Sequence, residues 1–258
     1  MHRMMGPAFF LTLLFAALSS AHAQKDEGAV TFCFNNWPPY TQMVEGKPAG
    51  LSVEILREAA ARTGLRPTFV ELPWNRCLQS VRGGYVDAVI DAAPRAEFLQ
   101  GPASFSVYTN TFWVRDNDPL HAFDLPALQN YRIGLVNGYV YPKPLHDALR
   151  PPAYQIEYSV DDPANVMKLG YGRVDAIIGD YIATRVLARE HRLSLRALQP
   201  PHSFDRLYPS FNRNRADLHK RIDVAIATMI KEGFVDEIYH RRFGISLTDL
   251  IKAGPASR

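Results

Sequence analysis

The chain has 258 residues, of which 47% are hydrophobic and 21% charged, and its formal net charge at pH 7 is +3. The hydrophobic content predicts a packed core and excludes a disordered chain, and the length suits one large domain or two modest ones. Because the net charge is small and no basic run occurs, the chain has no electrostatic footprint for nucleic acid.

Residues 1–23 have the pattern of a secretory signal peptide. Arg3 gives a basic start, residues 8–18 form an apolar run, and Ala21-His22-Ala23 has the small-x-small pattern of a cleavage site. The alternative is an uncleaved N-terminal anchor. No later segment has about 18 consecutive apolar residues, so we expect no further membrane span. The mature chain would then begin near Gln24, in an oxidising compartment.

Strands and helices alternate through the first part of the mature chain. Pro38 and Pro39 prevent a helix after the first strand, which places Trp37 and Tyr40 on a rigid loop. The predicted order of β-α-β-α-β is typical of a doubly wound sheet. We expect a strand over 30–35, a turn over 46–50, a helix over 51–63, a strand over 67–72, a helix over 75–82 and a buried strand over 88–91.

A second series resembles the first, after a loop at 93–98, a strand at 107–114 and a polar turn at 116–119 that is a candidate lobe boundary. We expect strands over 131–136 and 154–158, with helices over 143–149, 163–171 and 181–189. A second crossing over 195–205 would lead to a strand over 207–211, helices over 216–232 and 235–243, and a frayed end over 248–258.

Near copies of one motif end the two series. Gly84-Tyr85-Val86-Asp87-Ala88-Val89-Ile90 and Gly172-Arg173-Val174-Asp175-Ala176-Ile177-Ile178 both read as a turn followed by a buried parallel strand. The copies lie too far apart for a solenoid repeat and favour two similar α/β lobes, the alternative being coincidence between two short strands. Ligands of open α/β sheets bind beyond the carboxyl ends of the strands, where Asp91 and Asp180 follow the copies.

The order of these features resembles the extracellular solute-binding proteins of ABC importers, family 3, in the branch that binds polar amino acids, with this chain a divergent member. The matching features are Trp37-Pro38-Pro39-Tyr40, Gly50 before the first helix, Trp74 opening the second, the Gly-x-Val-Asp-Ala strand, Val136-Asn137-Gly138, Asp180 after the second copy, and the closing Ile-Tyr-x-x-Arg-Phe-Gly that ends at Gly244.

The resemblance implies a type II two-lobed α/β fold with a doubly wound sheet in each lobe and two hinge crossings. Residues 24–114 and 205–258 would form the first lobe and residues 115–204 the second. It further implies a monomeric periplasmic protein, without cofactor, that closes on a small polar solute in the cleft. The solute, an amino acid or a related amine or carboxylate, would be handed to an ABC permease in the inner membrane.

The resemblance also assigns candidate ligand contacts. In the family, aromatic residues such as Trp37 and Trp74 sandwich the ligand, and Tyr40 is a further candidate, whereas ordinary core packing is the alternative for all three. Asp180 matches the position that receives the ligand ammonium group. An N-cap for the helix over 181–189 is an alternative for Asp180 that is compatible with this role.

The carboxylate-binding pattern of the family departs in this chain. Where the family has Thr-x-x-Arg, the sequence reads Ala92-Ala93-Pro94-Arg95, so Arg95 either grips a carboxylate from a shortened loop or faces solvent. Arg76, one turn into its helix, is a second candidate. Gly138 and Tyr139 stand where the family often has Gly-Thr. These departures leave the ligand open between an α-amino acid and another polar solute.

Other chemistry is less well supported by the sequence. Cys33 and Cys77 either pair as a disulfide or stay as two buried thiols. The histidines are scattered without the spacing of metal ligands, and no nucleophile elbow or phosphate loop occurs. Two other functions remain open. One is a dehydratase of small cyclic carboxylic acids with Asp91 or Asp180 as general acid, and the other is a module that binds a sensor or redox partner.

Overall fold

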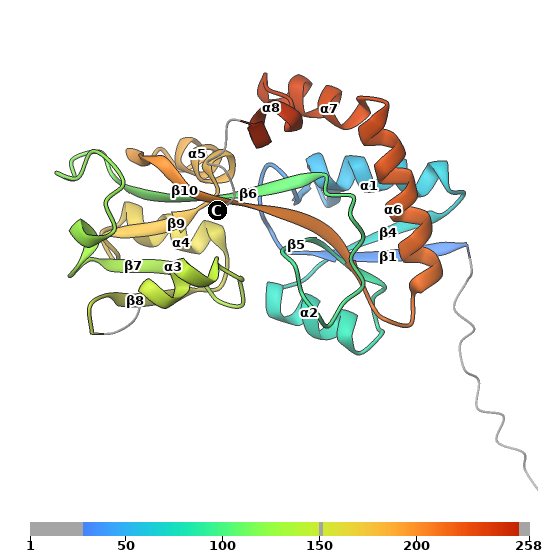
Figure 1. The fold of residues 1–258 in the computed structure, drawn as a ribbon, viewed down its shortest axis with the longest axis horizontal. Coiled ribbons are helices and arrows are strands. Elements are labelled where there is room, and N and C mark those ends of the chain that lie inside the picture. Colours follow the sequence, from blue (N-terminus) through green and yellow to red (C-terminus); the bar gives the residue numbers. More distant parts are fainter. Residues whose placement is uncertain (1–27, 150–151, 253–258) are drawn as a thin grey trace, which may run out of the picture.

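The computed structural model describes residues 28–149 and 152–252 (Figure 1). The predicted signal peptide lies outside the described residues. Within them, eight strands form one sheet in the order β4-β1-β5-β10-β6-β9-β7-β8, and β2 pairs with β3 in a hairpin. The strands are β1 (Ala29–Phe34), β2 (Gln42–Val44), β3 (Lys47–Ala49), β4 (Arg66–Glu71), β5 (Ala88–Ala92), β6 (Ser106–Arg115), β7 (Arg132–Val136), β8 (Gln155–Ser159), β9 (Ala176–Gly179) and β10 (Leu195–Phe211). The helices are α1 (Leu51–Arg62), α2 (Trp74–Arg82), a 3-10 turn (Pro126–Leu128), α3 (Lys143–Ala148), α4 (Asp162–Gly170), α5 (Tyr181–Glu190), α6 (Ala216–Lys231), α7 (Phe234–Phe243) and α8 (Leu247–Lys252).

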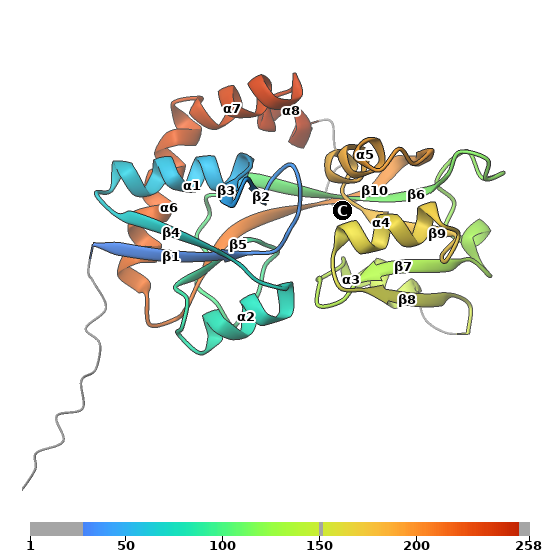
Figure 2. The same ribbon diagram turned by 180° about the vertical axis from the view of Figure 1, so that it is seen from behind.

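The sheet has two parallel parts of the same topology. In the first lobe, which comprises β4, β1, β5 and the helices packed on them, β1 pairs in parallel with both β4 and β5. In the second lobe, β7 pairs in parallel with both β8 and β9. The long strands β6 and β10 run antiparallel to each other between the lobes, as Figure 2 also shows. This is the predicted two-lobed fold with two crossings. The division of the chain at residues 114 and 204 stays a prediction.

Apolar spacing accounts for the helices that cover the first lobe. Helix α1 buries the residues that its spacing places on one face, and α6 packs beside it over the same face of the sheet (Figure 1). The buried positions of α6 are Leu218, Ile222, Ala225, Ile226 and Met229. Ile230, the residue after Met229, is 38% exposed.

The predicted crossing over 195–205 and the predicted strand over 207–211 belong to one continuous strand, β10, and Pro200 and Pro201 fall in a register shift of its ladder with β6. Two predictions of local structure are wrong. The turn over 46–50 belongs to the β2–β3 hairpin, whose two-residue turn places Glu45 and Gly46 at positive φ. Residues 248–252, expected to fray, belong to α8, and residues 253–258 lie outside the described residues.

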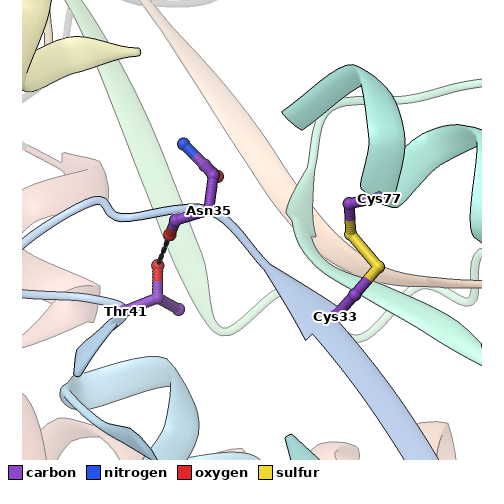
Figure 3. Close-up of a disulfide and its surroundings, with 4 residues drawn as sticks. All are labelled: Cys33, Asn35, Thr41 and Cys77. Carbon is purple, nitrogen blue, oxygen red and sulfur yellow. Dashed lines mark hydrogen bonds between the residues drawn. A yellow bond between two sulfur atoms is a disulfide. The ribbon is translucent and has the colours of Figure 1, made fainter. Parts of the chain in front are cut away.

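A disulfide joins Cys33 in β1 to Cys77 in α2, with Cα atoms 5.7 Å apart (Figure 3). Pairing is therefore the alternative that the structure contains. The bond fastens α2, which begins at Trp74, to the strand that leads into Asn35 and Trp37. Two segments that carry predicted ligand contacts are thus covalently held together.

Candidate ligand pocket between the lobes

A pocket lies between the lobes, beyond the carboxyl ends of β1 and β5. Its empty volume is about 520 Å³, a figure that includes space open to solvent. The first lobe and the long strands supply most of the wall, and the loop after β7 supplies the rest. The lining residues are Asn35, Trp37, Thr41, Trp74, Ile90, Asp91, Ala93, Arg95, Tyr108, Tyr139, Val140, Tyr141, Asp205 and Leu207. This is the edge of the sheet at which open α/β folds bind their ligands.

The loop after β1 presents Trp37 to the pocket. The Trp37 carbonyl accepts hydrogen bonds from the backbone N–H groups of Tyr40 and Thr41, at 2.9 and 3.0 Å, which closes a tight turn. The Thr41 hydroxyl donates to the Asn35 carbonyl at 2.8 Å (Figure 3). The Trp37 ring stacks on the Tyr40 ring, with centroids 4.1 Å apart, and it is also stacked with the Tyr108 ring, with centroids 5.9 Å apart. The rigid aromatic loop predicted from the two prolines is therefore present.

Trp74 and Arg95 of the first lobe meet Gly138 of the second. The Gly138 carbonyl accepts hydrogen bonds from Trp74 Nε1 at 3.0 Å and from Arg95 Nη2 at 2.6 Å. Gly138 has a φ of +82°, and a Cβ at this position would lie 2.1 Å from Asn75 Oδ1. Only glycine can take this backbone conformation so close to the neighbouring lobe without strain. Gly138 is thus an interlobe contact.

Arg95 is held in place by its own loop. The Gln100 side chain accepts from the Arg95 backbone N–H at 2.8 Å and donates to the Ala93 carbonyl at 3.0 Å and to the Ser210 hydroxyl. The Arg95 guanidinium lies 5.7 Å from the centroid of the Trp74 ring. Burial lowers the pKa of Arg95, and its Nε has no hydrogen-bond partner among the described residues. Arg95 thus lines the pocket and retains one buried donor without a partner in the described structure.

Tyr139 connects the lobes through its hydroxyl group. This hydroxyl donates to Asp162 Oδ2 at 2.6 Å and accepts from Asn35 Nδ2 at 3.2 Å. Burial raises the pKa of Asp162 to about 7 and that of Tyr139 well above its usual range. The Tyr139 ring lies nearly perpendicular to Tyr108 and to Trp74. A tyrosine in place of the family's threonine therefore fills part of the pocket and ties Asn35 to the second lobe.

Two carboxylates, Asp91 and Asp205, line the pocket. Asp91 ends the β5 copy of the motif, is 9% exposed and has a φ of +55°. Its Oδ1 accepts from the Ser106 hydroxyl, whereas Oδ2 has no hydrogen-bond partner in the described structure. Asp205 Oδ2 accepts from Asn110 Nδ2 at 2.7 Å. Burial raises the pKa of Asp91 to about 6 and also raises that of Asp205.

Four predicted contacts do not line the pocket, and Gly138, the interlobe contact described above, is one of them. Tyr40 is fully buried behind Trp37. Arg76 is exposed on α2. Asp180 is fully buried and caps α5, because its Oδ1 accepts from the backbone N–H groups of Ile182 and Ala183 at 3.0 and 2.9 Å. Its Oδ2 accepts from the Thr109 N–H at 3.0 Å and from the Thr109 hydroxyl at 2.9 Å. The structure thus contains the helix cap that was the alternative for Asp180.

Sequence reasoning missed several lining residues. Asn35 and Thr41 flank the aromatic loop, so their position in that loop was a usable signal. Tyr108 and Asp205 lie on β6 and β10, where nothing in the local sequence indicates which strand face meets the pocket. Tyr141 follows Tyr139 in the loop after β7, and its hydroxyl accepts from the Val136 N–H at 2.9 Å.

Comparison with known proteins agrees with this architecture. The family model for bacterial extracellular solute-binding proteins, family 3, matches residues 30–245. The chain belongs to this family. The L-cystine-binding protein TcyJ of Escherichia coli strain K12 is 24% identical over 217 residues, which cover 82% of this chain and 81% of TcyJ. The arginine-binding periplasmic protein of Mannheimia haemolytica is 23% identical over 239 residues, or 91% and 97% of the two chains.

Solved structures share the fold of this solute-binding protein. A histidine kinase sensor domain with similarity to periplasmic binding proteins superposes with a TM-score of 0.76 at 19% identity, over 84% of this chain and 97% of that chain. A putative L-cystine ABC transporter protein from Listeria monocytogenes gives a TM-score of 0.75 at 19% identity, over 84% and 98%. The curated relatives are named as binding proteins rather than enzymes, which confirms the expectation that this chain is a binding protein.

None of the helices in the described part of the chain combines the length and apolarity required to cross a bilayer. Residues 28–149 and 152–252 contain no cluster of three histidine, cysteine, aspartate or glutamate side chains that could hold a metal ion.

Proposed function

We propose that this solute-binding protein captures a small polar solute, an amino acid or a related compound, in the interlobe pocket and delivers it to an ABC permease. The observation that carries the proposal is the pocket itself, which combines aromatic rings with charged groups at the carboxyl edge of the sheet. The curated relatives, named for L-cystine and arginine, support an amino-acid-like solute. The arginine-binding relative is named as a periplasmic protein, which supports the same compartment for this chain.

In this proposal the solute lies between the Trp37 and Trp74 side chains. Arg95 supplies donors for an anionic group, because the residue lines the pocket and its buried Nε has no partner among the described residues. Gly138 and Tyr139 close the pocket from the second lobe through their bonds to Arg95 and Asn35. A solute that contacts both lobes favours the conformation in which these bonds form, so binding would be coupled to hinge closure at β6 and β10.

A thermal-shift panel of amino acids, amines and small carboxylates tests the proposal. A ligand at 100 times its Kd adds about 2.7 kcal/mol of stability by mass action. For a protein of this size, that shift raises the melting temperature by roughly 5–10 °C. If no member of the panel raises the melting temperature, the solute-capture proposal fails.

Delivery to a permease needs a separate measurement. Cells with and without this chain would be compared for uptake of the best thermal-shift hit, with an Arg95→Lys chain as a variant that keeps the charge but not the fork of donors. Uptake that is the same in the presence and absence of the chain would contradict the transport role while leaving solute capture intact.

A further inference from the structure

The charged side chains of the pocket are unevenly distributed. Among the described residues that line it, two carboxylates, Asp91 and Asp205, accompany one guanidinium, Arg95. Arg95 donates to the Gly138 carbonyl and lies 3.9 Å from Glu97, and within the described structure it forms no ion pair with either pocket carboxylate. His202 is near Asp205, but burial lowers its pKa, so at neutral pH it carries no compensating charge. The described lining of the pocket therefore has more carboxylates than cationic groups.

Asp91 is the less satisfied of the two carboxylates. Only its Oδ1 has a donor, the Ser106 hydroxyl, while Oδ2 is buried without a hydrogen-bond partner among the described residues. Burial raises the pKa of Asp91 more than the nearby Ser106 and Ser52 hydroxyls lower it, and the Ser52 hydroxyl has no hydrogen-bond partner among the described residues. A buried carboxylate oxygen without a donor is costly, and a donor brought by a ligand would remove that cost.

The aromatic lining matches the same chemistry. The ring faces of tryptophan and tyrosine attract cations within about 6 Å of their centroids. Trp74 already has the Arg95 guanidinium at 5.7 Å. Trp37 and Tyr108 lie with centroids 5.9 Å apart and nearly parallel planes, and both line the pocket with Asp91. Carboxylates beside aromatic faces are a combination that suits a positively charged nitrogen.

We propose that Asp91 and Asp205, with the Trp37 and Tyr108 rings, form a subsite for a protonated nitrogen, so that the solute of this protein carries an amine or a guanidinium group. The inference rests on the proposed function and names the class of solute. It assigns the cation to the first lobe and the long strands, instead of to Asp180, whose oxygens are occupied by the cap of α5 and by Thr109.

Titration calorimetry on the mature chain tests this subsite with four probes. L-arginine and L-cystine carry both a cation and a carboxylate, agmatine carries cations alone, and glutarate carries carboxylates alone. We expect at least one cation-bearing probe to bind at least tenfold more tightly than glutarate. Because a charge-assisted hydrogen bond is lost, Asp91→Asn and Asp205→Asn should each weaken that binding about ten- to a hundredfold.

Asp116→Asn is the matched control, because it removes one carboxylate from an exposed turn outside the pocket and should leave the affinity unchanged. Circular dichroism would verify that each variant is folded, and Asp205, which is half-buried, provides a second variant if Asp91→Asn is not. The inference is overturned if an uncharged or anionic solute of the wider panel binds while no cation-bearing solute does, or if both pocket variants keep full affinity. If nothing in the wider panel binds, the proposed function fails as well.

Discussion

The two copies of the repeated motif use their central aspartate in the same way and then diverge. In the first lobe, Asp87 Oδ2 accepts from the Thr31 N–H at 2.8 Å, and the Asp87 N–H donates to the Thr31 carbonyl at 3.0 Å. In the second lobe, Asp175 Oδ2 accepts from the Arg132 N–H at 3.0 Å, and the Asp175 N–H donates to the Arg132 carbonyl at 2.8 Å. Each aspartate thus fastens the motif strand to the first strand of its lobe.

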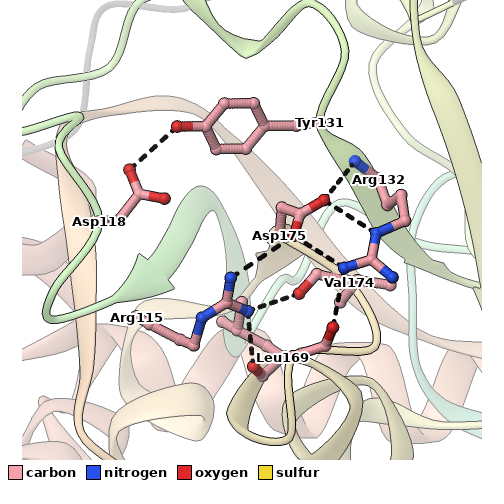
Figure 4. Close-up of polar contacts among 8 residues, drawn as sticks. Arg115, Asp118, Tyr131, Arg132, Leu169, Val174 and Asp175 are labelled. Atoms are coloured by element: carbon pink, nitrogen blue, oxygen red, sulfur yellow. Dashed lines mark hydrogen bonds and ion pairs between the residues drawn. The ribbon is translucent and has the colours of Figure 1, made fainter.

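The surroundings of the two aspartates differ. The Asp87 side chain is only 2% exposed and pairs with Arg215 Nε at 2.7 Å. The Asp175 side chain is 27% exposed and is shared by Arg132 and Arg115, as Figure 4 shows. Hydrogen bonds to Arg132 lower the pKa of Asp175 to about 2. The backbone role is common to both lobes, while the depth of burial and the identity of the arginine partners differ between them.

The residues that follow the two copies of the motif differ in their chemistry. Asp91 follows the first copy, lines the pocket and has a buried oxygen without a partner among the described residues, whereas Gly179 stands at its place in the second copy. One residue further on, Asp180 of the second copy is fully hydrogen-bonded, where the first copy has Ala92. Main-chain pairing keeps the motif constant inside each lobe, and the strand ends are free to carry different chemistry.

The largest expected effect comes from removing the deeper of the two central aspartates. Asp87→Ala leaves the Arg215 charge and the Thr31 N–H without their partner, so it should lower the free energy of unfolding by about 3–5 kcal/mol. Asp175→Ala is the matched variant in the other lobe. Because its ion pairs are screened by solvent, it should cost about 1–2 kcal/mol. Urea denaturation of both variants at pH 7 measures the difference, and equal losses would contradict the distinction drawn from burial.

The disulfide is the next feature that distinguishes the two lobes, since both cysteines of the chain lie in the first lobe. The Cys33→Ser, Cys77→Ser double variant opens a loop with a sequence separation of 44, which the chain-entropy account values at about 4 kcal/mol. Urea denaturation of the oxidised protein and of the double variant measures this loss. A loss below about 1 kcal/mol would show that β1 and α2 are held together without the covalent bond.

Asp91→Asn should stabilise the ligand-free protein. The pKa of Asp91 is raised from 3.8 to about 6, so the folded state disfavours the carboxylate. This destabilisation is absent below pH 3.8, develops as the pH rises to 6 and then reaches up to about 3 kcal/mol. Asparagine mimics the neutral acid, and the melting temperature of the variant should exceed that of the native chain at pH 7 but not at pH 4. An equal or lower melting temperature at pH 7 would contradict the desolvation of Asp91.

The regular parts of the fold were predictable because local patterns determine them. The spacing of Leu51, Ile55 and Leu56 predicted α1 from the correct residue, and the two motif copies predicted β5 and β9. The hairpin turn at Glu45 and Gly46 was missed, because glutamate is an uncommon residue at positive φ. The segment with Pro200 and Pro201 was predicted as the second crossing, and the structure forms this crossing as a long strand, which tolerates prolines where its ladder is shifted.

The site was less predictable, since it depends on how distant segments meet. Trp37, Trp74, Arg95 and Tyr139 were candidates from sequence, and the structure places all four at the pocket. The sequence could not tell which of Tyr40 and Trp37 faces the pocket, because the stacking of the two rings decides this. The sequence also could not tell an aspartate that caps a helix from one that lines a cavity. That distinction depends on the orientation of Thr109, which lies on another strand.

Asp180→Asn is the smallest expected change and the most direct test of that distinction. Asparagine is as good an N-cap as aspartate, so the bonds from Ile182 and Ala183 survive, while the Thr109 N–H loses its acceptor. Burial raises the pKa of Asp180, so removing its charge returns part of this loss. We therefore expect a stability change within about 1 kcal/mol and a solute affinity, measured by titration calorimetry, within about twofold of the native value. An affinity loss of tenfold or more at unchanged stability would return the ligand's nitrogen to Asp180 and remove the contrast between the two strand ends.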